Sequence, residues 1–208
     1  MKKILALVLV IGCIFAFASC EALLFGNTNT NTDNEGKEQT LANIQKCIDD
    51  AAPKSADISV EFKSEIGDLN GSYDVTYNED GSATVDYSYE LFNKFDENAE
   101  LEEFKSTHTG VVTVSSNGDV DGDLNGIASI EAVSFDIKLD EQYLSSHKIT
   151  ASILEAKVEA ENTFDVVGVD IPYDIDLSIT TGNGRVTAVV ISYETENGPI
   201  EIVAVYHY

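Results

Sequence analysis

The chain has 208 residues, and 37 acidic side chains stand against 12 basic ones, a formal net charge of −25. A field of this sign repels phosphate backbones and anionic lipid headgroups, which argues against nucleic acid as a partner. The apolar fraction of 43% is ordinary for a folded domain and excludes a chain that is disordered throughout. Nine Tyr, nine Phe and no Trp favour strands, because aromatic side chains fit a pleated surface.

The first 19 residues have the layout of a secretory signal peptide. Lys2 and Lys3 precede an uncharged apolar run, which small residues close just before Cys20. The run is too short for a transmembrane helix, which needs about 20 apolar residues. Removal of this leader takes the net charge of the chain from −25 to −27, because both lysines leave with it.

The sequence Phe17-Ala18-Ser19-Cys20 resembles the lipobox of bacterial lipoproteins, in which small residues precede an invariant cysteine. Phe17 departs from the usual Leu of that box. The resemblance implies that residues 1–19 are removed and that Cys20 carries the lipid. It also implies an extracytoplasmic protein of the bacterial cell envelope, anchored to a membrane. Plain secretion and an uncleaved anchor are the alternatives.

Residues 20–37 are predicted to be a flexible tether, since the Asn/Thr repeat at 26–34 has no apolar side chain to bury. Residues 38–208 are predicted to form a single domain that begins with one amphipathic helix. Its apolar residues recur at helical spacing, Thr40 can cap its start and Pro53 ends it. These apolar residues are Leu41, Ile44, Ile48 and Ala51.

Apolar and polar residues alternate with period two through most of the remaining chain, which predicts strands. The fold class is therefore mainly β: an antiparallel meander that forms a curved half-barrel or barrel-like sheet. Two runs, 186–193 and 200–206, are apolar on both phases and predict central strands buried on both faces. The alternating apolar sets are Ile58/Val60/Phe62, Tyr73/Val75/Tyr77, Ala83/Val85/Tyr87/Tyr89/Leu91, Val112/Val114, Val133/Phe135/Ile137/Leu139 and Ile171/Tyr173/Ile175/Leu177/Ile179.

Dipeptides that favour tight hairpin turns separate these runs, because Asn-Gly and Asp-Gly accept a positive φ. A change of phase within 149–160 predicts a β-bulge. The turn dipeptides are Asn70-Gly71, Asp80-Gly81, Asn117-Gly118, Asn125-Gly126, Asn183-Gly184 and Asn197-Gly198.

One segment resembles a calcium loop of the EF-hand or dockerin kind, with oxygen ligands at alternate positions. The candidate ligands are Asn117, Asp119, Asp121 and Asp123. Ala128 stands at the twelfth position, where such loops have a bidentate Glu. The favoured interpretation is a hairpin with Asn117-Gly118 at its tip. We therefore expect no cofactor, and a weak calcium site is the alternative.

No motif predicts catalysis, and we expect a protein that is not an enzyme. His108, His147 and His207 lie far apart, without the spacing of metal ligands. Cys47 is the only cysteine after Cys20, so an internal disulfide is excluded, and we expect it to be a small hydrophobic residue of the helix.

The order of lipobox, tether, amphipathic helix and antiparallel meander resembles the lipid-binding lipoproteins of the LolA and LppX type. That resemblance implies a concave sheet holding a lipid or other apolar ligand against Phe62, Tyr87, Phe135, Tyr173 and Ile175. The favoured hypothesis is a structural or protein-interaction domain with a filled core, whose partner is another envelope protein. An apolar cavity of several hundred Å³ would favour the ligand.

Overall fold

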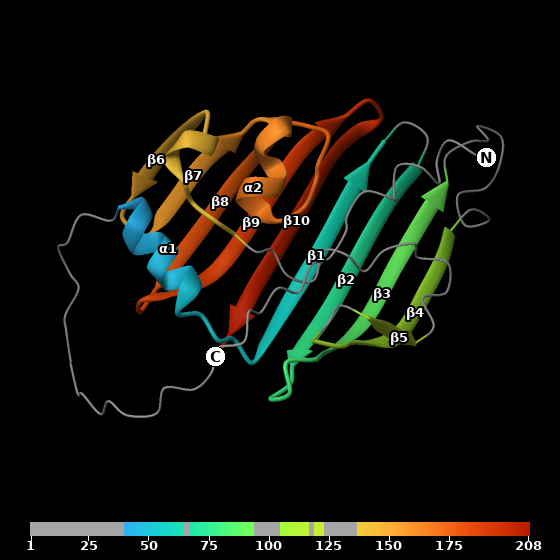
Figure 1. The fold of residues 1–208 in the computed structure, drawn as a ribbon. Coiled ribbons are helices and arrows are strands. Elements are labelled where there is room, and N and C mark those ends of the chain that lie inside the picture. The colour runs from blue at the N-terminus through green and yellow to red at the C-terminus, as the bar shows by residue number, and fades with distance from the viewer. Residues whose placement is uncertain (1–39, 65–66, 94–104, 117–118, 123–136) are drawn as a thin grey trace.

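The computed structural model describes residues 40–64, 67–93, 105–116, 119–122 and 137–208. These residues form one antiparallel sheet of ten strands, with helices on one face (Figure 1). The predicted signal peptide, Cys20 and the tether lie outside the described residues. The strands are β1 (Ser55–Lys63), β2 (Gly67–Tyr77), β3 (Ala83–Asn93), β4 (Lys105–Val114), β5 (Val120–Gly122), β6 (Ser146–Thr150), β7 (Ile153–Val158), β8 (Ile175–Gly182), β9 (Arg185–Thr195) and β10 (Gly198–His207).

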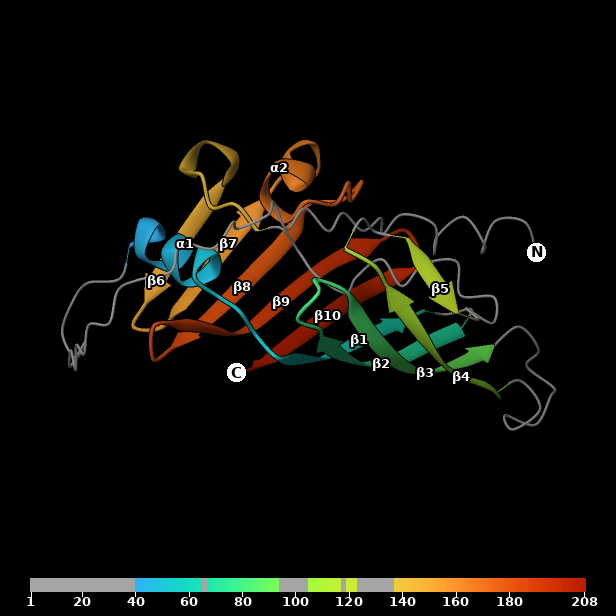
Figure 2. The same cartoon turned by 60° about the horizontal axis from the view of Figure 1, so that its bottom comes forward.

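The strand order is β5-β4-β3-β2-β1-β10-β9-β8-β7-β6, so the sheet is open, with β5 and β6 at its edges. Each pairing joins neighbours along the chain except that of β1 with β10 at the centre. The strands β1–β5 therefore follow one another from the centre of the sheet to one edge. The strands β6–β10 follow one another from the other edge back to the centre. The predicted antiparallel meander is confirmed, and of its two expected forms the open, curved one is correct (Figure 2).

Helix α1 (Leu41–Asp49) confirms the predicted amphipathic helix. The Thr40 side chain accepts a hydrogen bond from the backbone N–H of Asn43 at 3.2 Å, as an N-cap residue does. Ile44 is fully buried, and the helix packs against β9. The other helical segments are η2 (Glu141–Tyr143), η3 (Ala160–Asn162) and α2 (Thr163–Val167).

The alternation gives the sheet one apolar face and one open face. The apolar face carries two groups of buried side chains, which Tyr193 and Tyr206 both contact. The helix-covered cluster joins strands β7–β9 to Ile44 of α1 and to Val166 and Val167 of α2. The strand cluster contains only strand residues: Ala56, Ile58, Tyr73, Val75, Ala83, Val85, Tyr87, Tyr89, Val112, Val114, Ile200, Ile202 and Ala204.

Two predicted hairpin turns are confirmed by positive φ angles: Gly81 at 81° between β2 and β3, and Asn183 and Gly184 at 54° and 73° between β8 and β9. The prediction for 197–198 is partly wrong. The turn residues there are Glu196 and Asn197, because Gly198 already pairs with Thr195 as the first residue of β10. Gly198 has a φ of 143°, and a Cβ on it would overlap the Lys63 carbonyl oxygen. The dipeptides at 117–118 and 125–126 lie outside the described residues.

The predicted bulge within 149–160 is wrong. Thr150 pairs with Ile153, so β6 and β7 form a hairpin through Ala151 and Ser152, and Ala151 adopts a φ of 49°. The chain reverses at this turn, which explains the change of phase.

The predicted strand that includes Ile137 and Leu139 is also wrong in its described part, because residues 137–140 belong to no strand. The Gln45 side chain of α1 bonds this segment instead. Its Nε2 donates to the Ile137 carbonyl at 3.2 Å, and its Oε1 accepts from the Leu139 N–H at 2.6 Å. Strand β8 begins at Ile175 rather than at Ile171.

The prediction of a turn at 70–71 is wrong, since both residues lie inside β2. Gly71 is there for a different reason: a Cβ on it would come within 2.9 Å of the Tyr73 ring. Gly110 of β4 lies opposite Tyr87 of β3, and a Cβ on it would come within 2.6 Å of that ring. Both glycines therefore make room for tyrosine rings that lie along the sheet.

We predict that Gly110→Ala destabilises the domain by about 1–3 kcal/mol, the usual cost of overpacking, because the Tyr87 ring would have to move. Urea unfolding of the two proteins measures the difference. Gly182→Ala is the control, since its Cβ would meet only a methyl group of Thr187 at 3.3 Å. Equal unfolding midpoints for the two variants would contradict the packing argument.

Candidate functional site

The strand cluster and the helix-covered cluster share one face of the sheet but differ in what lies over them. Helices α1 and α2 lie over the half of the sheet that β6–β9 form (Figures 1 and 2). Within the described residues, no helix contributes a side chain to the strand cluster. The strand cluster is nonetheless buried, with no member more than 9% exposed, and no described helix side chain takes part in it.

Tyrosine rings form a layer on this part of the face. Tyr73 and Tyr87 lie opposite each other on β2 and β3. The Tyr87 and Tyr89 rings stack with centroids 6.3 Å apart, and Tyr89 stacks on His108 at 4.7 Å with only 11° between the ring planes. We call Tyr73, Tyr87 and Tyr89 the aromatic layer. All three tyrosines are buried, with 9%, 3% and 5% of their surface exposed.

The Tyr73 hydroxyl is the unusual polar group of the layer. The residue is only 9% exposed, yet in the described part of the chain its hydroxyl has no hydrogen-bond partner. Burial raises the pKa of this phenol to about 12, and Tyr89 and Tyr87 add to the shift. Buried hydroxyls normally find a partner, because leaving one unpaired costs about 1–3 kcal/mol. A ligand with a polar atom at this position would remove that cost.

Two further tyrosines join the strand cluster to the helix-covered cluster. Burial raises the pKa of Tyr193 and of Tyr206 to about 12 each. Both contact the two clusters, and Tyr193 also stacks on Tyr173 at 5.7 Å. The chain therefore carries a line of neutral phenols along the junction of its two cores.

The residues predicted to line a concave face are divided between the two clusters. Phe62 and Tyr87 belong to the strand cluster, whereas Tyr173 and Ile175 pack in the helix-covered cluster. Phe135 lies outside the described residues. Sequence reasoning did not single out Tyr73, because its unpaired hydroxyl follows from strand register, which the alternation alone does not fix.

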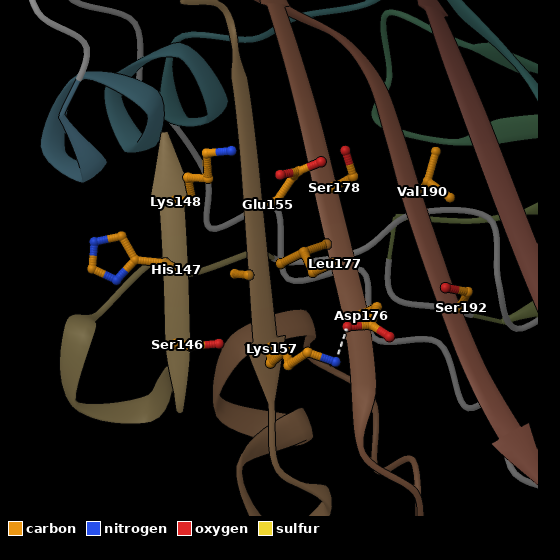
Figure 3. A pocket seen from close by; sticks show the side chains of 11 residues that line it. Ser146, His147, Lys148, Glu155, Lys157, Asp176, Leu177, Ser178, Val190 and Ser192 are labelled. Carbon is orange, nitrogen blue, oxygen red and sulfur yellow. Dashed lines mark ion pairs between the residues drawn. The ribbon is translucent and has the colours of Figure 1, made fainter. Parts of the chain in front are cut away.

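The opposite, open face of the sheet carries an open groove of about 560 Å³ across β6–β9, lined mainly by polar and charged residues. Figure 3 shows it with the helices behind the sheet. Lys157 Nζ lies 2.8 Å from Asp176 Oδ1, while the His147 ring points away from the groove. The groove is not the apolar cavity that ligand carriage would require. Its lining residues are Ser146, His147, Lys148, Glu155, Ala156, Lys157, Asp176, Leu177, Ser178, Val190 and Ser192.

Three aspartates line up across the open face further along the sheet. Asp57, Asp74 and Asp86 lie directly opposite one another on β1, β2 and β3. His207 Nε2 lies 2.9 Å from Asp57 Oδ2, but no described residue pairs with Asp74 or Asp86. Like charges directly opposite each other on neighbouring strands destabilise a sheet.

The predicted calcium loop falls on the hairpin between β4 and β5. Val114 pairs with Val120, and the Ser115 N–H donates to the Asp119 carbonyl at 2.8 Å, so the strands of the favoured hairpin are present. Asn117 and Asp123 lie outside the described residues, and calcium binding stays a prediction. Among the described residues, no three His, Cys, Asp or Glu side chains are grouped to hold a metal ion.

The remaining candidates are in separate places. His147 is exposed on the edge strand β6, and His108 and His207 are on β4 and β10. Cys47 is half-buried against the helix-covered cluster, and burial raises the pKa of its thiol, so it resembles a packing residue more than a nucleophile. No helix in the described ranges is long and apolar enough to cross a membrane.

The fold has distant likenesses among solved structures. No family model matches the sequence, and no curated protein matches it. The fold is similar to the crystal structure of LprF from Mycobacterium bovis, with a TM-score of 0.36 and 13% sequence identity. The match covers 79% of this chain and 90% of that one, and it is too distant to carry an argument about function.

We predict that the domain gains stability as sodium chloride rises from 10 mM to 150 mM. The carboxylates of Asp57, Asp74 and Asp86 lie on strands spaced about 4.8 Å apart, and the Debye length falls from about 30 Å to about 8 Å over this range. Urea unfolding at each salt concentration measures the effect.

Asp74→Asn should raise the midpoint at low salt and weaken the salt dependence, because it interrupts the row of carboxylates. Glu196→Gln, which removes one charge at the exposed turn between β9 and β10, is the control. A midpoint that stays flat or falls with salt would mean that repulsion across the open face does not limit stability.

Proposed function

We propose that this chain is a lipid-anchored, extracytoplasmic binding protein that is not an enzyme. It holds an apolar ligand with a polar group against the aromatic layer. The observation that carries the proposal is the Tyr73 hydroxyl, which is buried on an apolar face without a partner in the described residues.

The composition of the strand cluster defines the chemistry of the ligand. Its members are aliphatic or aromatic, and none is charged. Burying an unpaired charge beside them would cost far more than burying a neutral polar group. The ligand's polar group is therefore uncharged, such as an ester, an amide or a hydroxyl. The phenol of Tyr73 can donate to such a group or accept from it.

The amino-terminal segment supplies the location. With Cys20 acylated, the tether at residues 20–37 keeps the domain near the membrane, where neutral lipids are concentrated. A coil of about twelve residues has a mean reach of about 20 Å. The acidic exterior disfavours anionic headgroups, which agrees with an uncharged ligand.

A protein-interaction domain is the second candidate function. The observation in its favour is on the open face, where apolar side chains of β9 and β10 lie beside the groove and Val205 is 39% exposed.

A binding experiment with Tyr73→Phe tests the ligand proposal. A fluorescent diacylglycerol should bind the wild-type protein with a 1:1 stoichiometry. The variant should bind it about three- to tenfold more weakly, which corresponds to the loss of one hydrogen bond. The variant without ligand should unfold at an equal or higher urea concentration, because the substitution removes an unpaired buried hydroxyl.

Tyr143→Phe is the matched control, since Tyr143 packs against the helix-covered cluster and should leave the affinity unchanged. The proposal fails if the wild-type protein shows no saturable binding, or if Tyr73→Phe binds the probe as tightly as wild type.

A further inference from the structure

Four apolar side chains form a patch on the open face of the neighbouring strands β9 and β10. Val203 of β10 lies opposite Val190 of β9, and Val205 lies opposite Ala188. Val205 is 39% exposed, and the other three are half-buried. We call these four residues the valine stripe.

The sequence of β9 and β10 is apolar on both phases, a pattern typical of strands that are covered on both faces. The apolar face meets this expectation, because Ile191 and Ile202 are buried there. The open face does not meet it, since Val205 is 39% exposed there and the other three residues of the stripe are only half-buried. Contiguous exposed apolar residues with a polar rim are typical of protein–protein contacts.

The charged residues around the valine stripe indicate the charge of a partner that would bind there. On one side, Asp57 lies opposite Val205, and Asp74 and Asp86 follow in the same row. Glu201 of β10 lies opposite Glu61 of β1 two rows away, where Lys63 Nζ lies 2.9 Å from Glu61 Oε2. The side of the stripe toward β1–β3 is therefore strongly acidic.

The groove adjoins the other side of the stripe and shares Val190 with it. Its two lysines face carboxylates: Lys157 pairs with Asp176 at 2.8 Å, and Lys148 lies opposite Glu155 on the neighbouring strand. The groove is therefore close to neutral and adds room beside the stripe without adding a basic field.

We propose that the valine stripe docks a basic polypeptide segment of a partner protein, with apolar side chains over the valines and lysines or arginines toward Asp57 and Asp74. This inference gives the second candidate function a surface and a partner chemistry, and it rests on that candidate. A second copy of this chain is the wrong occupant, because face-to-face packing would bring acidic rows together. An anionic membrane is disfavoured for the same reason.

The test uses the full-length acylated protein and a fluorescein-labelled peptide of alternating lysine and leucine. Val203→Thr combined with Val205→Thr keeps the β-branched shape of both residues but removes apolar surface. It should raise the dissociation constant about tenfold, from the loss of two buried methyl groups. A peptide of alternating lysine and serine, with the same charge, should bind the wild-type protein at least tenfold more weakly.

Val111→Thr is the matched control. Val111 is 54% exposed on the same face but lies beyond Asp86 on β4, outside the stripe, so this variant should bind the lysine–leucine peptide as wild type does. The proposal is overturned if the peptide does not bind, if the stripe variant binds it as tightly as wild type, or if the lysine–serine peptide binds equally well.

The diacylglycerol probe separates this result from the ligand proposal. The aromatic layer and the valine stripe are on opposite faces, so saturating lipid should leave peptide affinity unchanged. Loss of lipid binding in Tyr73→Phe with normal peptide binding concerns only the first proposal. The reverse pattern in the stripe variant concerns only the second.

Discussion

The structure depends on one constraint, the register of ten antiparallel strands. Side chains alternate between the faces of a strand, so a shift of one residue would exchange the buried set and the exposed set. On the apolar face this register aligns apolar residues: Ala204, Ile58 and Tyr73 lie side by side. One residue later along β1, Ser59 and Ser72 lie side by side on the open face. Tight turns hold this register where β2 meets β3, β6 meets β7, β8 meets β9 and β9 meets β10.

Both proposed surfaces follow from the same register. It places Gly110 opposite Tyr87, which lets the ring lie along the sheet and form part of the aromatic layer. It also aligns Asp57, Asp74 and Asp86, an arrangement that costs stability through repulsion. A basic partner on the open face would relieve that repulsion, while a neutral ligand on the apolar face would satisfy the Tyr73 hydroxyl.

Much of the fold could be predicted from local patterns, because alternation and turn residues act over short distances. Thr40 correctly marked the start of α1, and Asn183-Gly184 correctly marked a hairpin. The failures involve long-range contacts. The sequence assigned Gly71 to a turn, but the absence of a side chain there makes room for a tyrosine ring. It assigned Ile137 to a strand, but the side chain of Gln45, 92 residues away, bonds the Ile137 backbone instead. The candidate site was predicted only as a face, since the unpaired hydroxyl of Tyr73 depends on packing that no local pattern encodes.

Native mass spectrometry of the protein purified from its own envelope tests the central claim most directly. Comparison with a denaturing spectrum separates the covalent anchor at Cys20 from any ligand held by the domain. The account predicts an additional mass of one neutral lipid in the native spectrum, lost on denaturation and reduced in Tyr73→Phe. Identical masses in the native and denaturing spectra of the wild-type protein would contradict it.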